Sequence, residues 1–334
     1  MKRKLLLLLT AVALLATVGC REQLKKASGS NQAPKTSIGE AYELFVICNE
    51  NHWNNYIQAA VSEVFECEVP GLSRPEKYFH VIDHKSFDDV NDVERKHCNL
   101  LAVRIDPTNN GTTITSAEDV NASQQLVVTI HSTSSAEAAQ YIRDNAYMLR
   151  DMFEQNERMI HFSTNCASES PEAMEIIKEL TGISMHVPGG FMTENPKEDI
   201  LKWFKRKYYN KSQHIFVFTE PCEDINTVSA EQLEQSIDNH INIISVEDEE
   251  CSYMCISKER QIFITPKEIN GRLWYEIRCC WRVEGYPMGG PMVSYSTYDE
   301  ANKRMITIAF ALFSPDQMQR HDMAQLESLI YLTK

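Results

Sequence analysis

The chain has 334 residues, and its 47 acidic side chains outnumber the 33 basic ones, which gives a net charge of −14. A body this acidic repels the phosphates of nucleic acids, so we expect no nucleic-acid partner. The length suits one large domain or two small ones. After the first twenty residues, no apolar run reaches the roughly 20 residues that a membrane-spanning helix needs.

The N-terminal segment has the pattern of a signal peptide, with a basic head at 2–4 and an uncharged apolar stretch at 5–18. Its end resembles a bacterial lipobox, in which the cysteine receives a diacylglycerol and becomes the new N-terminus. Thr17 departs from the aliphatic residue usual at its place in that motif. We predict a lipoprotein signal peptide at 1–19 and lipid attachment at Cys20. Removal of this segment lowers the net charge from −14 to −17.

A flexible tether is predicted at 20–38, because Ser, Gly, Asn, Gln, Pro and Lys dominate there without apolar periodicity. Such a coil spans roughly 25 Å on average, so the body can stand off a membrane surface. We expect the globular body to occupy 39–334, with a possible sub-boundary near 165–170.

The first part of the body alternates between strand and helix patterns, which predicts a mixed α/β unit. The expected strands lie at 42–48, 78–82, 99–105 and 124–131, and the expected helices at 53–65 and 136–158.

The next segment begins with a helix that Ser170 and Pro171 start and that ends near Gly182. A further helix is expected from Asn195, with the basic and aromatic stretch 202–211 as its last turns, where cations suit the helix dipole. A strand at 214–220 follows. Ser229 and Gln232 then form a capping box for another helix.

The last eighty residues predict an antiparallel meander. Residues 272–284 alternate strictly between two faces, which is a strong strand pattern. The segment 285–291, "GYPMGGP", is expected to be a turn or loop, with strands on either side of it and a third at 304–313. Ser314 and Gln317 are expected to cap a final helix. The predicted fold class is therefore α+β: a mixed α/β first part, then a C-terminal antiparallel meander covered by a terminal helix.

One face of strand 272–284 combines arginines with a tryptophan, which are residue types enriched at interaction hot spots. With the glycine-rich segment that follows, it forms a possible binding surface. Its residues are Arg272, Trp274, Glu276, Arg278, Arg282, Met288, Gly289 and Gly290. The alternative is that long helices from the first half cover this face and pair the arginines with glutamates.

No pattern identifies catalytic residues, a metal ion or a cofactor. We expect neither a bound metal ion nor a cofactor. Four cysteines could suggest a zinc site: Cys251, Cys255, Cys279 and Cys280. Adjacent cysteines on a strand point to opposite faces, however, so Cys279 and Cys280 cannot readily share one metal ion. GxSxG and HExxH motifs are absent from the sequence. The leading hypothesis is a membrane-anchored binding or assembly module. The alternative is an envelope hydrolase whose site lies near 272–294.

Several segments resemble a family of uncharacterised lipoproteins from Bacteroidetes over nearly the whole mature chain. They are "AYELFVICNENHWN" at 41–54, "VPGL" at 69–72, "WRVEGYPMGGPMVSYSTYDEANKRMI" at 281–306 and "QLESLIY" at 325–331. The resemblance implies an envelope location and a common fold, but no activity and no catalytic residues. Surface lipoproteins of that phylum often carry an acidic export signal after the cysteine, which 21–25 does not resemble. We therefore expect an outer-membrane anchor facing the periplasm, with an envelope protein as a possible partner.

Overall fold

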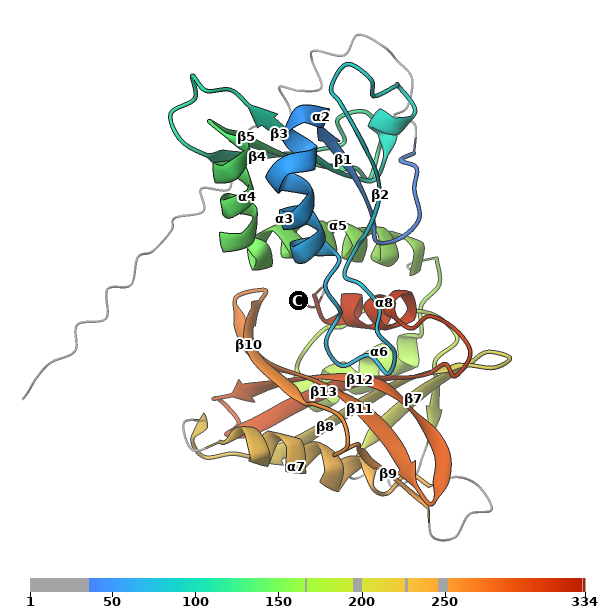
Figure 1. The fold of residues 1–334 in the computed structure, drawn as a ribbon. Coiled ribbons are helices and arrows are strands. Elements are labelled where there is room, and N and C mark those ends of the chain that lie inside the picture. The colour runs from blue at the N-terminus through green and yellow to red at the C-terminus, as the bar shows by residue number, and fades with distance from the viewer. Residues whose placement is uncertain are drawn as a thin grey trace, which may run out of the picture.

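The computed structural model describes residues 36–165, 167–194, 200–225, 228–245, 252–331 and 333. These residues form two sheets, with helices α5 (Ala146–Asn165) and α8 (Arg320–Tyr331) packed on each other between them (Figure 1). The predicted signal peptide 1–19, Cys20 and most of the tether 20–38 lie outside the described residues.

The first sheet has five strands in the order β2-β1-β3-β5-β4, and only β4 runs antiparallel to its neighbour. Its strands are β1 (Glu43–Cys48), β2 (His80–Lys85), β3 (Asn99–Ile105), β4 (Thr113–Glu118) and β5 (Leu126–Ser132). Between β1 and β2 lie α2 (Glu50–His52), the π-helical turn η1 (Trp53–Ile57) and α3 (Gln58–Phe65); the short turn η2 (Glu94–Lys96) precedes β3.

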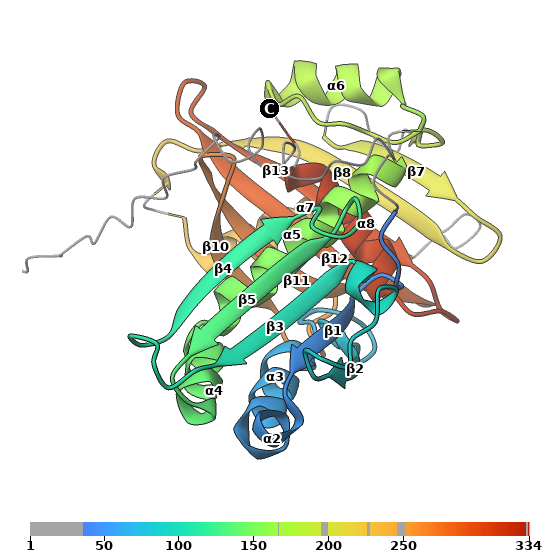
Figure 2. The ribbon, with the colours of Figure 1, turned by 90° about the horizontal axis from the view of Figure 1, so that it is seen from above.

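Alternate strand residues divide the apolar side chains of this sheet between its two faces. Leu44 and Val46 of β1 join the core beneath α3, α4 (Ser135–Asp144) and α5. Phe45 and Ile47 lie on the opposite face, where Val90 of the loop after β2 packs on them. Figure 2 shows the sheet from above, with α5 passing beneath its strands.

The single long helix predicted at 136–158 is in fact two helices. The break falls at Asn145, whose side-chain amide donates to the Tyr141 carbonyl oxygen at 2.9 Å. An asparagine side chain that bonds to nearby backbone competes with helix continuation, so α4 and α5 take different directions.

The second sheet is antiparallel, with the strand order β10-β11-β12-β13-β8-β7-β6 and with β9 paired to β11. Its strands are β6 (Met192–Glu194), β7 (Lys202–Lys207), β8 (Ser212–Pro221), β9 (Tyr253–Ile256), β10 (Phe263–Ile269), β11 (Arg272–Glu284), β12 (Tyr286–Asp299) and β13 (Arg304–Phe313). Helices α6 (Pro171–Thr181) and α8 cover one face, and α7 (Ala230–Ile241) covers the other. The predicted α+β class, with a terminal helix on the meander, is confirmed.

Three local predictions in the second sheet are wrong. The stretch 202–211 is not the end of a helix. Residues 202–207 form strand β7, which pairs with β8, and 208–211 connect the two strands. Of the segment 285–291, only Gly285 lies in a turn, because β12 already begins at Tyr286 and Gly289 and Gly290 pair with β11.

The third wrong prediction is the position at which α8 begins. The helix begins at Arg320, not after Ser314, because a carboxylate from the first half of the chain caps it. Glu76 accepts the backbone N–H of Gln319 at 2.7 Å and that of Arg320 at 2.9 Å. Negative charge at a helix N-terminus satisfies its free N–H groups and suits the helix dipole.

Candidate functional site

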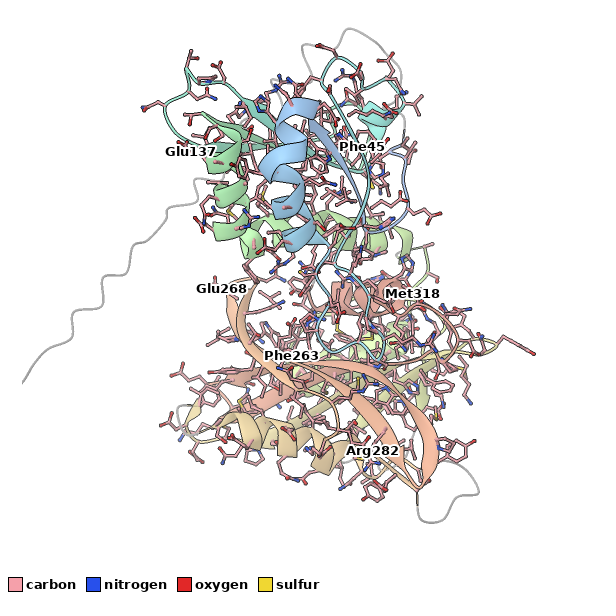
Figure 3. The ribbon with its side chains drawn as sticks, viewed as in Figure 1. Phe45, Glu137, Phe263, Glu268, Arg282 and Met318 are labelled. Carbon is pink, nitrogen blue, oxygen red and sulfur yellow. The ribbon has the colours of Figure 1, made fainter. Side chains whose placement is uncertain are left out.

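The predicted binding face of β11 is buried. Trp274, Glu276 and Arg278 are only 1%, 3% and 7% exposed, because α8 covers them. The prediction of an exposed binding surface is therefore wrong for these three residues. Arg272 is exposed, and Arg282 lies near the other end of β11, away from the space between the sheets (Figure 3). The structure shows the alternative, a covered face, but the covering helix is α8 and not a helix from the first half of the chain. Arg278 pairs with Glu276 of β11 and with Glu327 of α8.

Buried charges under α8 pair with one another. Arg278 donates from Nε to Glu276 at 2.9 Å and from Nη1 to Glu327 of α8 at 3.1 Å. Lys267 lies 2.9 Å from Glu276, and the Tyr295 hydroxyl donates to the same carboxylate at 3.0 Å. Burial alone would raise the pKa of Glu276, but the charges of Arg278 and Lys267 outweigh it and bring the pKa down to about 2.

The pairing continues across to the first layer through α5. Arg320 of α8 donates to Glu154 of α5 at 2.5 Å, and its guanidinium lies 4.3 Å from the centre of the Tyr42 ring. Arg158 of α5 pairs with the same Glu154 at 3.5 Å and stacks on Tyr331 at 3.9 Å. We call these residues the interlayer charge cluster: Glu154, Arg158, Lys267, Glu276, Arg278, Arg320 and Glu327.

The interlayer charge cluster resembles a structural joint more than a catalytic site. Each of its charges already has a partner of opposite sign at hydrogen-bonding distance, and no side chain in the cluster is more than 14% exposed. A charge that is paired and removed from water cannot easily exchange its partner for a substrate. Its place between α5 and α8 indicates that it fixes the two layers together.

The glycine-rich segment borders a shallow hollow of about 260 Å³. Gly289 and Gly290 pair with Arg282 and Trp281 of β11, so they belong to the sheet. Met288, next to them, packs at the edge of the core beneath α7.

The one thiol in this hollow is poorly suited to nucleophilic attack. Burial raises the pKa of Cys280, although Ser73 and Arg260 oppose that rise, and a nucleophilic cysteine needs the thiolate. Cys279 points into the core on the opposite face, as expected for adjacent strand residues. The hollow therefore gives no support to a hydrolase.

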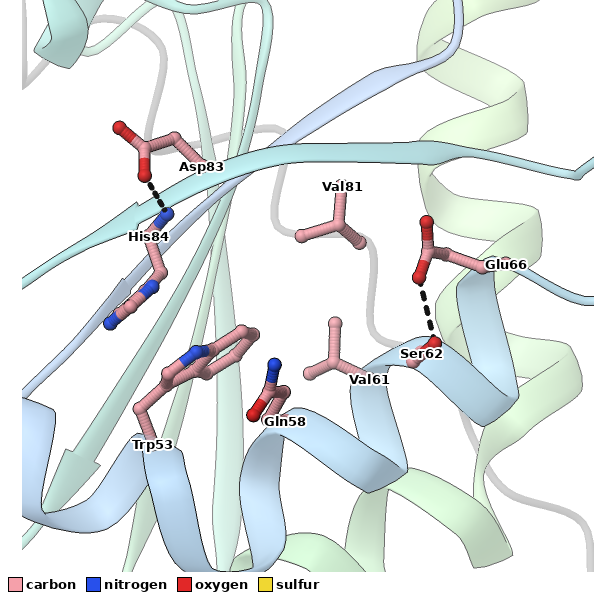
Figure 4. A pocket seen from close by; sticks show the side chains of 8 residues that line it. All are labelled: Trp53, Gln58, Val61, Ser62, Glu66, Val81, Asp83 and His84. Atoms are coloured by element: carbon pink, nitrogen blue, oxygen red, sulfur yellow. Dashed lines mark hydrogen bonds between the residues drawn. The ribbon is translucent and has the colours of Figure 1, made fainter.

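A second pocket, of about 220 Å³, lies beside the π-helical turn after β1 (Figure 4). The His84 ring stacks on Trp53 with 4.7 Å between ring centres, and its Nε2 lies 2.7 Å from the Glu50 carboxylate. On the other wall, Ser62 donates to Glu66 at 2.7 Å. Turns of π-helix are frequent at functional sites, but most polar groups here already pair with one another.

The largest of these concave sites is an apolar groove of about 530 Å³ between the end of α5 and α6. We call it the α6 groove; its lining is Phe162, Met174, Glu175, Lys178, Ser184, Met185 and His186. Figure 2 shows α6 at the outer side of the molecule. Its volume falls within the roughly 300–1,000 Å³ of small-molecule sites.

One polar group in the α6 groove has an unused hydrogen-bonding atom. The side chain of His186 is 10% exposed, and its Nδ1 lies 3.2 Å from the Glu169 carboxylate. Its Nε2 is fully buried and has no partner among the described residues. The Phe162 ring meets the imidazole edge-on, at 5.2 Å between centres. Buried polar atoms normally have a partner, and this nitrogen is an exception that no water-sized group reaches from the groove.

The chain brings Glu169 and His186 together by folding back after α6. Gly182 ends the helix with a φ of 74°, a left-handed conformation that glycine adopts readily. The returning segment then pairs with the residues before α6, through the Ser170 N–H to the Val187 carbonyl oxygen at 2.9 Å. Sequence reasoning missed this pair, because no short motif joins residues on opposite sides of a helix.

Two other histidines are buried without charge. Burial, together with the nearby charges of His321 and Arg320, lowers the pKa of His161 to about 3, and its Nε2 lies 2.9 Å from the Tyr42 hydroxyl. Burial also lowers the pKa of His214 to about 3, with Lys205 and Lys207 adding to the effect.

We expect the free energy of unfolding to fall as the pH drops from 6.5 toward 4.5. In the unfolded chain these two histidines bind protons near pH 6.5, whereas in the folded chain they remain neutral until about pH 3. Protons therefore favour the unfolded state, with a slope of at most about 2.7 kcal/mol per pH unit for two groups. Urea denaturation at several pH values measures the slope. His161→Gln with His214→Gln should flatten it, while His80→Gln, at an exposed site, should not. A wild-type stability that is constant over this range would contradict the assignment.

Two family models match the chain. Residues 37–163 match a domain of unknown function (DUF8532), and residues 170–332 match a second domain of unknown function (DUF4837). Together the two matches cover most of the chain, so both of its layers carry uncharacterised domain families. A comparison with curated proteins finds no match. Among the described residues, no helix is both long and apolar enough to span a membrane.

Proposed function

We propose that this chain is a lipid-anchored protein of the cell envelope that acts as a binding or assembly module, not as an enzyme. The pattern at 1–19, with Cys20 directly after it, supports the anchor. The polar composition of 20–38 supports a tether that lets the body reach a partner in the periplasm. An outer-membrane position facing the periplasm follows from the resemblance and from the lack of an acidic segment at 21–25.

The observation that carries the binding role is the α6 groove. It combines an apolar lining with a volume of about 530 Å³, which is in the range of small-molecule sites. A hydrolase would need a nucleophile hydrogen-bonded to a base such as His186. None of the described residues makes that bond to its Nε2. The charged side chains of the interlayer charge cluster are already paired with one another, so they do not support a hydrolase either.

Cys20→Ala tests the anchor. The variant should leave the membrane fraction or remain as an uncleaved precursor, because no thiol is available for the diacylglycerol. Detergent partitioning and fractionation of native envelopes measure this, and crosslinking in the same envelopes should give partner bands that Cys20→Ala loses. Partitioning identical to that of the wild type would reject the anchor. A complete lack of crosslinks in the wild type would reject the assembly role.

A further inference from the structure

We infer that the hairpin of β7 and β8 is a contact surface for an anionic membrane, which holds the body against the bilayer in one orientation. The inference rests on the proposed anchor at Cys20 and goes beyond it, because it assigns a second, reversible membrane contact to the folded body. We call the residues of this contact the hairpin surface: Met192, Lys205, Lys207, Tyr208 and Tyr209.

Basic side chains are concentrated in this hairpin. The stretch 202–211 has five lysines and arginines and no acidic residue, which leaves 28 basic against 47 acidic side chains, a net charge of −19, for the rest of the chain. Salt screens exposed charges beyond about 10 Å at 0.1 M, so a hairpin at the edge of the body presents mainly its own charge to a membrane. Each lysine or arginine near an anionic bilayer strengthens binding about fivefold.

Part of this charge lies on one face of the sheet. Lys205 and Lys207 are two positions apart on β7, so their side chains share a face. Met192 of β6 is paired with Lys205 and lies on that face too, with 71% of its surface exposed. The face therefore combines cations with an exposed apolar side chain.

Two further cations of the stretch fix the hairpin on the body. Arg206 donates from Nε to the side-chain oxygen of Gln213 on β8 at 3.0 Å. Lys211 donates to the Asp322 carboxylate of α8 at 2.8 Å. These contacts hold the turn in place, so the hairpin surface is already formed before it meets a membrane.

The turn between the two strands adds exposed aromatic rings. The Tyr208 N–H donates to the Lys211 carbonyl oxygen at 2.8 Å, which leaves Tyr209 and Asn210 at the tip. Tyr208 is 45% exposed, and Tyr209 is fully exposed. Tyrosine is enriched where the membrane meets water, since its ring is apolar and its hydroxyl group is polar. Lysine is depleted at protein interfaces, so a membrane suits this surface better than an acidic protein does.

The chain enters the body on the side that has this hairpin. Tyr42, just before β1, and Lys211 both contact the first turn of α8: the Arg320 guanidinium lies 4.3 Å from the Tyr42 ring centre, and Asp322 accepts from Lys211. Figures 1 and 2 both show the blue segment that leads into β1 and the yellow end of the hairpin on the right of the molecule. The predicted tether joins the body through this segment, so a lipid at Cys20 would keep the hairpin side near the membrane.

The direct test is co-sedimentation with lipid vesicles of the chain from Cys20 to Lys334, made without the signal peptide and hence without acyl groups. Vesicles of phosphatidylcholine alone are compared with vesicles in which a third of the lipid is phosphatidylglycerol. The chain should bind the anionic vesicles several times more tightly at about 0.1 M salt. This preference should disappear at about 1 M salt, where the screening length falls to about 3 Å.

Variants locate the contact. Lys205→Gln with Lys207→Gln should weaken binding to the anionic vesicles about tenfold or more. Lys258→Gln with Lys303→Gln is the matched control, because it makes the same change in net charge at two exposed positions outside the hairpin, and it should bind like the wild type. Tyr209→Ser, at a fully exposed tip where folding does not depend on the ring, should weaken binding about threefold or more. Thermal unfolding of each variant checks that it is folded.

Three results would overturn the inference: equal binding to both kinds of vesicle, equal weakening by the control pair, or binding that neither the Lys205 and Lys207 pair nor Tyr209→Ser reduces. An acidic protein partner would give no vesicle binding, together with envelope crosslinks that the hairpin variants lose. Because the vesicle assay uses a chain without lipid, its outcome does not depend on acylation of Cys20. Failure of the anchor and failure of the hairpin contact are therefore measured separately.

Discussion

Replacement of Arg278 by methionine is expected to lower the free energy of unfolding by about 3–5 kcal/mol, the usual cost of removing one partner of a buried ion pair. Arg278 is 7% exposed, and its guanidinium donates to both Glu276 and Glu327. Without it, Glu327 loses its cation, and Glu276 keeps only Lys267. Two carboxylates would then lie in a space that water does not reach. Urea denaturation measures the loss.

Arg272→Met is the matched control, because Arg272 is exposed on the same strand. It should change the free energy of unfolding by less than about 0.5 kcal/mol. Adding Glu327→Met to Arg278→Met should recover part of the lost free energy of unfolding, since it removes one of the two carboxylates that Arg278→Met leaves without this cation. If Arg278→Met were as mild as the Arg272 variant, the cluster would not join the two layers.

Gly290→Ala is expected to lower the free energy of unfolding by about 3 kcal/mol, because an added methyl group would overlap a neighbouring strand. A Cβ at Gly290 would lie 1.9 Å from the carbonyl oxygen of Leu312 and 3.2 Å from the indole nitrogen of Trp281. That nitrogen donates to the same carbonyl oxygen at 3.2 Å, so the alanine would push apart two strands and break this bond. Thermal and urea denaturation measure the effect.

Gly182→Ala provides the comparison for the added methyl group. Gly182 has a φ of 74° but no atom within 4 Å of the position of a Cβ, so its alanine variant should cost only about 1 kcal/mol for the left-handed backbone. Equal losses at the two sites would mean that β12 can shift to accommodate the methyl group. Glycine at 290 would then not be required by strand packing.

Much of the fold could be predicted where one local period controls the structure. The strand at 272–284 follows from strict alternation, and its observed bounds are the same, Arg272–Glu284. The capping box of Ser229 and Gln232 is present, because both of its hydrogen bonds form within one helical turn. These features depend only on residues a few positions apart.

The misses share a physical cause, which is contact between residues distant in the sequence. Glu76 decides where α8 begins, although more than two hundred positions separate them. The face of 272–284 could be predicted, but its burial depends on where α8 packs. The pair of Glu169 and His186 depends on the return of the chain after α6. Local patterns contain none of this information.

The position of α8 in the chain also affects how the protein is made. The ribosome produces α8 after every described strand of the second sheet, yet this helix supplies Glu327 for Arg278 and Arg320 for Glu154. A nascent or shortened chain without α8 would expose an apolar sheet face with unpaired charges on it. Docking of α8 therefore covers the second sheet and joins it to the first layer in one step.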